Sequence, residues 1–173
     1  MRLTNTLQIL TTWWTIDKDY GTWKWIYNFH IWEPVIWDIL QELNIDKNTF
    51  DITSLLKKDS QDITDSDREM LGDWIMRRDA KKFVITHGTD TMIKTGKVIQ
   101  SMITNQHKTA VLVWSSRPYS MKITDANENI KYALESVQML FKQRFFWAFI
   151  CMNWETFRAW KVEKWDDGIF RKI

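Results

Sequence analysis

Short apolar runs alternate along the chain with longer segments in which apolar residues recur every three or four positions. Apolar, β-branched runs of about 4–8 residues are typical of buried strands, and the wider spacing is typical of helices that bury one face. The pattern predicts strands at residues 7–12, 50–55, 82–86, 109–113 and 146–152.

Helix signals lie between these runs. Pro34 is suited to the first turn of a helix, and apolar residues follow it at helical spacing as far as Leu43. Thr64 is a good N-cap residue, and the acidic residues after it suit the first turn of a helix that continues to about Arg78. Two more helices are expected at residues 92–103 and 125–141, whereas the charged tail at 155–173 is less regular.

The alternation of strand and helix predicts an α/β fold, a three-layer arrangement in which helices cover both faces of a parallel sheet. A chain of 173 residues without a repeat or a linker suits a single domain over residues 1–173. Sheets of this kind bind ligands at the carboxyl ends of their strands, so the turns at those ends are the places to look for chemistry.

Composition narrows the classes of function. Lys and Arg number 24 against 22 Asp and Glu, and this balance argues against a nucleic-acid-binding protein. The single cysteine, Cys151, fits a reducing cytoplasm. The first residues lack the apolar core of a signal peptide, and no apolar run reaches the roughly 20 residues of a membrane span. We therefore expect a cytoplasmic protein without a membrane partner.

Polar side chains gather where the predicted strands end. Residues 11–15 follow the first strand, 59–62 the second and 87–91 the third, and Lys161 and Lys164 come after the last. A threonine hydroxyl becomes a nucleophile when a neighbouring base takes its proton, and a partly desolvated lysine beside a carboxylate can be that base. His87 is a candidate base as well, but we favour a structural role in which its ring shapes the end of the strand.

Two segments carry a family resemblance. Residues 87–92, His-Gly-Thr-Asp-Thr-Met, match the second signature of the bacterial-type L-asparaginases. Residues 10–16 resemble their first signature, Thr-Gly-Gly-Thr-Ile, with tryptophan in place of both glycines. Segments 31–34, 58–62, 113–118 and 152–154 also resemble the family, and the length is similar to that of short forms with only the amino-terminal domain.

The resemblance implies roles for residues near the first two strands. Thr15 corresponds to the nucleophilic threonine, and Tyr27 to the tyrosine beside it, with Tyr20 as the alternative. Ser60 and Gln61 correspond to residues that hold the α-carboxylate and the amine of the substrate.

It also implies a second catalytic group. Thr89 corresponds to the family's second threonine, and Asp90 to the aspartate that binds the substrate ammonium. Lys164 corresponds to the lysine that pairs with the second threonine, with Lys161 as the alternative.

The implied activity is the hydrolysis of L-asparagine, or a related small amide, to L-aspartate and ammonia. The resemblance implies no cofactor, and no Cys, His or Asp grouping has the spacing of a metal site. The family usually completes its site with a carboxyl-terminal domain, often from a partner subunit, and this chain ends before such a domain. We expect a homodimer. Two alternatives stay open: a non-catalytic domain that binds a small amino acid or amide, and an amidase subunit that needs a partner protein.

The chain has 12 tryptophans and only 5 glycines. Trp13, Trp14, Trp32, Trp114 and Trp154 stand where the resembling family usually has glycine. Tryptophans 23, 25, 147, 160 and 165 also lie in settings that favour glycine. We interpret this as a gene in which UGA codons mean glycine, read under a code in which UGA means tryptophan. Two indoles beside Thr15 are expected to leave the chain inactive or nearly so.

Overall fold

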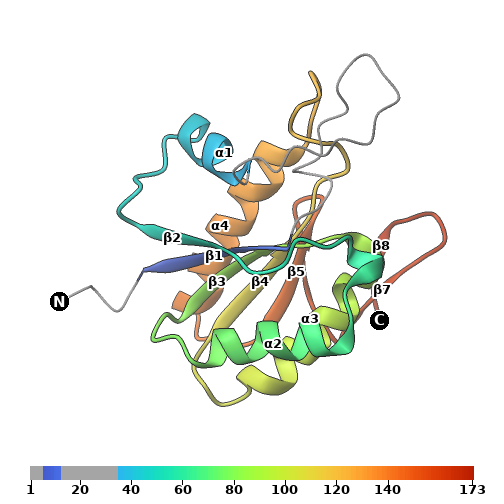
Figure 1. Cartoon of the computed structure of the whole chain (residues 1–173). Helices are drawn as coiled ribbons and strands as arrows, with labels where there is room; N and C mark the ends of the chain where they lie inside the picture. The colour runs from blue at the N-terminus through green and yellow to red at the C-terminus, as the bar shows by residue number, and fades with distance from the viewer. Residues whose placement is uncertain (1–5, 13–34) are drawn as a thin grey trace.

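The computed structural model describes residues 6–12 and 35–173, and these form a three-layer α/β fold (Figure 1). Six strands form one sheet in the order β2-β1-β3-β4-β5-β6. The strands are β1 (Leu7–Thr11), β2 (Phe50–Ser54), β3 (Lys82–Thr86), β4 (Thr109–Val113), β5 (Ala148–Met152) and β6 (Glu155–Arg158). The first five are parallel, and β6 is antiparallel to β5. The predicted fold class is confirmed.

Helices cover both faces of this sheet (Figure 1). Helices α1 (Ile36–Glu42) and α4 (Ala126–Lys142) pack on one face, and α2 (Asp65–Met76) and α3 (Thr89–Ile103) pack on the other. Every residue of β1, β3, β4 and β5 is buried, as expected for strands with a helix layer on each side.

Successive residues of a strand point alternately into the two hydrophobic cores, one on each face of the sheet. Ile9 and Val84 pack with α1 and α4, while their neighbours Leu10 and Ile85 pack with α2 and α3. This follows from the alternation of side chains along a strand. Each strand therefore needs a continuous apolar sequence, which is the pattern that predicted it.

The tail departs from the prediction. Residues 155–173, expected to be irregular, contain β6 and a hairpin of β7 (Val162–Lys164) and β8 (Phe170–Lys172). The helix expected at residues 92–103 begins three residues earlier, at Thr89, because Gly88 is its N-cap. The first helix begins after Val35, and Pro34 lies outside the described residues.

The sheet order fixes where a ligand site belongs. The chain leaves β1 toward β2 on one side and returns to β3 on the other, so the order reverses between β1 and β3. Ligands of open α/β sheets bind at such a reversal, outside the carboxyl ends of the strands.

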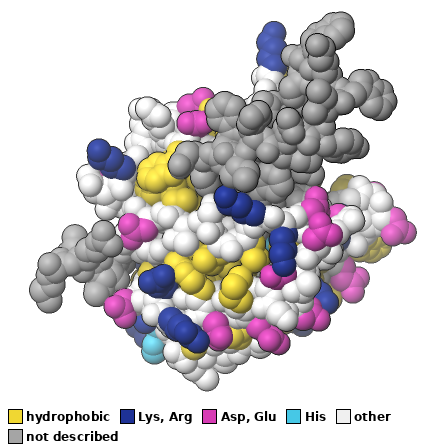
Figure 2. All heavy atoms as spheres, viewed as in Figure 1, with side chains coloured by type: hydrophobic (Ala, Val, Ile, Leu, Met, Phe, Trp, Pro, Cys, Tyr) yellow, Lys and Arg dark blue, Asp and Glu magenta, His cyan; other side chains and the backbone are white. Residues whose placement is uncertain are grey.

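The surface of the described residues mixes both signs of charge. On the face drawn in Figure 2, Lys and Arg side chains lie interspersed with Asp and Glu. None of the described helices combines the length and the apolar character that a membrane span requires.

Candidate active site

The site lies where β3 passes through His87 and Gly88 into helix α3. Neighbouring strands hold this turn: the hydroxyl of Thr12 donates to the carbonyl oxygen of Thr86 at 2.7 Å, and the amide of His87 donates to that of Val113 at 2.9 Å. Thr12 is 1% exposed. The turn is thus fixed between the ends of β1 and β4.

A lysine from the tail contacts the first two residues of α3. The Nζ of Lys164 in β7 donates to Thr89 Oγ1 at 3.0 Å and to Asp90 Oδ1 at 2.7 Å. The lysine and aspartate side chains are 28% and 37% exposed. The family resemblance associates these three residues, and the β7–β8 hairpin brings Lys164 to the other two. Lys161, the alternative, is exposed in the turn between β6 and β7.

Asp90 accepts from a second side chain. Gln61 Nε2 donates to Asp90 Oδ2 at 2.8 Å. The hydrogen bond from Lys164, followed by the one from Gln61, holds the pKa of the Asp90 carboxyl below its ordinary value. Asp90 is therefore an anion at neutral pH, with both oxygens oriented.

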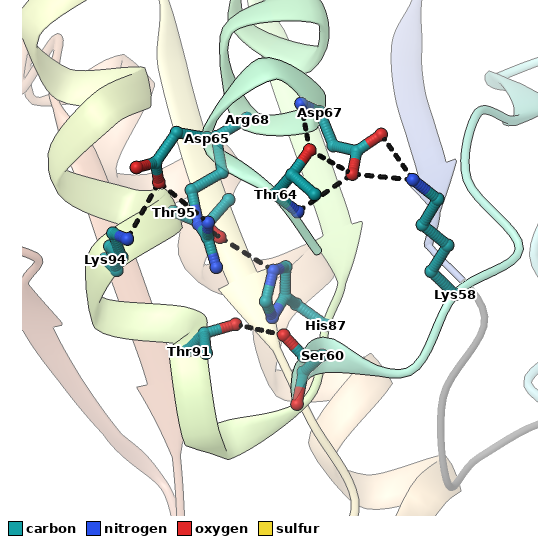
Figure 3. Close-up of polar contacts among 10 residues, drawn as sticks. All are labelled: Lys58, Ser60, Thr64, Asp65, Asp67, Arg68, His87, Thr91, Lys94 and Thr95. Atoms are coloured by element: carbon teal, nitrogen blue, oxygen red, sulfur yellow. Dashed lines mark hydrogen bonds and ion pairs between the residues drawn. The ribbon is translucent and has the colours of Figure 1, made fainter. Parts of the chain in front are cut away.

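The loop before α2 supplies the rest of the described site. Ser60 and Gln61 lie in the 3-10 helix η2 (Ser60–Asp62). Thr91 Oγ1 donates to the carbonyl oxygen of Ser60 at 2.6 Å, and Lys58 Nζ contacts Asp67 Oδ2 at 2.8 Å (Figure 3). Within the described part of the chain, the buried Ser60 hydroxyl has no hydrogen-bond partner. An unpaired buried hydroxyl is available to a ligand.

Other predicted residues fall outside this picture. Thr15, Tyr27 and Tyr20 lie outside the described residues. The described residues contain no group of three His, Cys, Asp or Glu side chains that could hold a metal ion.

His87 is fully buried, and its ring nitrogens contact Thr95 Oγ1 and the carbonyl oxygen of Gly88, each at 2.8 Å. Burial, with the positive charge of Arg68 as a lesser cause, lowers the pKa of His87 to about 4. The ring is neutral and does not reach solvent, which fits the structural role favoured for it.

Sequence reasoning missed Arg68 and Thr95. Both are buried, Arg68 in α2 and Thr95 in α3, and Arg68 Nε donates to Thr95 Oγ1 at 3.2 Å. An arginine in an acidic helix turn is ordinarily solvated. The only sequence signal was its spacing of three residues from Asp65, with which it forms an ion pair.

Two tryptophans in predicted glycine positions have unfavourable surroundings. Trp154, in the turn between β5 and β6, has a φ of 62°, a left-handed conformation that glycine adopts at little cost. The indole nitrogen of Trp114 is buried and, among the described residues, has no hydrogen-bond partner.

The fold and the site define a class of protein: an α/β domain with hydroxyl, carboxylate and ammonium groups at the carboxyl edge of its sheet. The family model "Asparaginase, N-terminal" matches residues 31–170, and the chain belongs to this family. No curated protein sequence matched the chain.

Solved structures share the fold. An L-asparaginase described as probable cytoplasmic, from Campylobacter jejuni, is 23% identical with a TM-score of 0.72, covering 92% of this chain and 49% of its own. The thermostable L-asparaginase from Thermococcus kodakarensis is 24% identical with a TM-score of 0.75, covering 97% and 51%. L-asparaginase I from Vibrio cholerae is 19% identical with a TM-score of 0.73 and the same two coverages. The chain thus spans about half the length of these relatives.

Proposed function

We propose that this protein is an amidohydrolase that converts L-asparagine to L-aspartate and ammonia. The observation that carries the proposal is the contact of Lys164 with both Thr89 and Asp90, which joins residues 74 and 75 positions apart at the reversal of the sheet. The family indicates the class of reaction, and the contact places these three polar side chains in one site.

Asp90 is the binding group for the substrate ammonium. Its carboxylate is ionised and already oriented by Lys164 and Gln61. The substrate ammonium would bind beside Lys164 on the same carboxylate. Lys164 Nζ, 3.0 Å from Thr89 Oγ1, is the group through which the proton of that hydroxyl would pass to solvent.

Thr15 is the proposed nucleophile of the first step. Its hydroxyl oxygen attacks the side-chain amide carbon, and its proton passes to the leaving nitrogen, which departs as ammonia. Backbone N–H groups of the strand-end turns stabilise the oxyanion. Water then cleaves the acyl-enzyme, releasing aspartate and restoring the hydroxyl. Tyr27, which corresponds to the family's tyrosine beside the nucleophile, remains part of this prediction.

Ser60 and Gln61 are proposed to hold the α-carboxylate and the amine of the substrate. The hydroxyl of Ser60, which is buried and has no partner among the described residues, supports this role, because a substrate oxygen would satisfy it. Thr91 and the Lys58–Asp67 pair hold the loop that presents it.

We also propose that glycine is the natural residue at ten of the tryptophan positions: 13, 14, 23, 25, 32, 114, 147, 154, 160 and 165. The left-handed φ of Trp154 supports this, because a bulky side chain is disfavoured there by roughly 1–2 kcal/mol. The codons test it directly: UGA at these positions is expected, and UGG would overturn the idea. The variant with glycine at all ten positions is called the glycine-restored chain below.

The deciding experiment measures ammonia release from asparagine by the present chain and by the glycine-restored chain. We expect ammonia release from the glycine-restored chain and none from the present chain. We also expect that Trp13→Gly together with Trp14→Gly is necessary for this activity. A misplacement of about 1 Å at Thr15 would already cost on the order of 10²-fold in rate. Equal activity in both chains would overturn the steric argument.

A non-catalytic domain that binds a small amino acid or amide is the second candidate, favoured by the oriented carboxylate of Asp90, which would serve binding alone. Calorimetry with asparagine and aspartate separates the two. Binding by the glycine-restored chain without ammonia release supports the binding domain. Ammonia release that appears only with a partner protein supports an amidase subunit. Location in the cytoplasm remains a prediction from the single cysteine.

A further inference from the structure

A hydrogen-bonded series of buried polar side chains connects helix α2 to the turn that begins α3 (Figure 3). It consists of Arg68, Thr95 and His87, which are 2%, 0% and 0% exposed. The reaction proposed above makes no use of any of them. Burial of an arginine and a histidine costs desolvation free energy, which hydrogen bonds and ion pairs must offset.

The donor and the acceptor of each hydrogen bond in this series of side chains can be assigned. Arg68 Nε only donates, so Thr95 Oγ1 is the acceptor of the 3.2 Å bond between them. The carbonyl oxygen of Gly88, 2.8 Å from His87 Nδ1, can only accept, so a neutral His87 carries its proton on Nδ1. Nε2 then accepts from the hydroxyl of Thr95, 2.8 Å away.

The outer end of the chain is anchored on the surface. Arg68 Nη1 donates to Asp65 Oδ1 at 3.0 Å, and Lys94 Nζ lies 2.8 Å from the same oxygen. Asp65 belongs to the first turn of α2 and Lys94 to α3, so the anchor joins the two helices. The guanidinium of Arg68 is therefore held in place from both helices.

Its inner end is the residue before the catalytic pair. Gly88 is the N-cap of α3 and has no side chain to cap the helix, and Thr89 and Asp90 follow it directly. The turn is held at three consecutive groups: the Thr86 carbonyl by Thr12, the His87 amide by Val113, and the Gly88 carbonyl by the His87 ring. Removing the third would free the peptide plane that aims Thr89.

We propose that Arg68 and Thr95 are positioning residues, which act through His87 to fix the Gly88 carbonyl and so aim Thr89 and Asp90 at Lys164. The effect on catalysis rests on the proposed function, whereas the effect on the Asp90–Lys164 contact does not. Arg68, Thr95 and His87 are called the positioning relay below.

The test compares Thr95→Val, which keeps the shape and removes the hydroxyl, with Thr95→Ser, which keeps the hydroxyl. Thr109→Val is the matched control: Thr109 is equally buried and bonds the Phe145 carbonyl, but lies at the opposite end of the sheet. In the glycine-restored chain, Thr95→Val should lower kcat by about 10- to 100-fold, with a smaller change in KM. Thr95→Ser should recover most of kcat, and Thr109→Val should leave it unchanged.

Two spectroscopic measurements test the relay without any turnover. Long-range proton–nitrogen NMR of the unsubstituted chain should find His87 with its proton on Nδ1, and a proton on Nε2 would overturn the relay even if no variant folds. Carboxyl NMR should find the pKa of Asp90 raised toward its ordinary value in Thr95→Val and unchanged in Thr109→Val. An unchanged Asp90 titration in Thr95→Val would overturn the positioning role.

The two proposals can fail separately. A glycine-restored chain that releases no ammonia contradicts the proposed function, while the His87 tautomer and the Asp90 titration still judge the relay. Ammonia release with equal kcat in Thr95→Val and the parent contradicts the relay and leaves the proposed function standing.

Discussion

The Asp90 carboxylate is held in a fixed orientation, because Lys164 and Gln61 each donate a hydrogen bond to one of its oxygens. Lys164→Met should raise the pKa of Asp90, because Lys164 is the largest cause of its lowering. The carboxylate would then take up its proton at a higher pH than in the parent. Carboxyl NMR titration measures this, with the exposed Lys161→Met as the control, for which no change is expected.

The hydroxyl of Thr89 accepts from Lys164 and so keeps its own proton available for transfer. In the glycine-restored chain, Thr89→Val should lower ammonia release by at least about 10²-fold, the scale of lost acid–base assistance. Thr104→Val, at the far end of α3, is the control and should keep the parent rate. Near-parent turnover in Thr89→Val would remove Thr89 from the mechanism.

The strain at Trp154 predicts a stabilising substitution. Trp154→Gly should raise the free energy of unfolding by about 1 kcal/mol, because the left-handed φ favours glycine and the indole is 47% exposed. Trp74→Gly should do the opposite, since Trp74 lies within α2 and packs against the core. Urea unfolding measures both, and a loss of stability in Trp154→Gly would contradict the glycine interpretation at that position.

Helix α2 is fixed at its start by a reciprocal capping box of Thr64 and Asp67. Thr64→Ala should lower the free energy of unfolding by about 1 kcal/mol, the usual effect of losing an N-cap. Ser66→Ala, an exposed change in the same turn, should be close to neutral. Equal unfolding midpoints for the two variants would show that the capping box contributes nothing.

The same capping box makes the free energy of unfolding depend on pH in the acidic range. Lys58, followed by Thr64, lowers the pKa of Asp67 from 3.8 to about 2. Because the folded pKa is depressed, this stabilisation is present above about pH 4 and is lost as pH falls through about 2. Asp67→Asn should therefore cost about 1 kcal/mol near neutral pH and little at about pH 2. Urea unfolding at both pH values checks this, and a cost independent of pH would contradict it.

Elements were predictable where packing imposed a continuous pattern. The strands flanked by two helix layers have apolar runs that sequence alone reveals, as in β4, where all five residues are buried. Strand β6 has only one buried residue, Phe157, and β7 and β8 have three residues each, so no periodicity marks them. The first turn of α3 was missed because its residues are polar and belong to the site.

The site followed the same division. The family signature pointed to Thr89 and Asp90 as candidates, and the spacing of the tail left Lys164 and Lys161 as alternatives. The β7–β8 hairpin, which no sequence pattern marks, brings Lys164 into contact with Thr89. Arg68 and Thr95 of the positioning relay were out of reach, because they are 27 residues apart in sequence and each has an ordinary surface residue type. Their burial comes from the packing of α2 on α3.

At the scale of the molecule, we expect a homodimer in solution. Exposed apolar side chains lie on and beside the β7–β8 hairpin, with Trp165 and Ile173 each 56% exposed. Light scattering at tens of micromolar should give twice the mass of the chain, and a monomer would count against the prediction. Trp154→Gly, which removes another exposed indole, is the control for non-specific association: a true dimer should persist in this variant.

The lysine of the site is carried by a two-stranded hairpin that forms no part of the main sheet. An isolated hairpin is marginally stable in water, and here only Val162 and Phe170 of its strands are buried in the core. Such segments open at a lower free energy than the surrounding structure. On heating, the hairpin amides should therefore exchange with solvent, and Lys164 should leave Thr89, at temperatures at which the sheet is still intact. Heat inactivation of the glycine-restored chain would then be a local and reversible event that precedes melting, and cooling alone would restore the site.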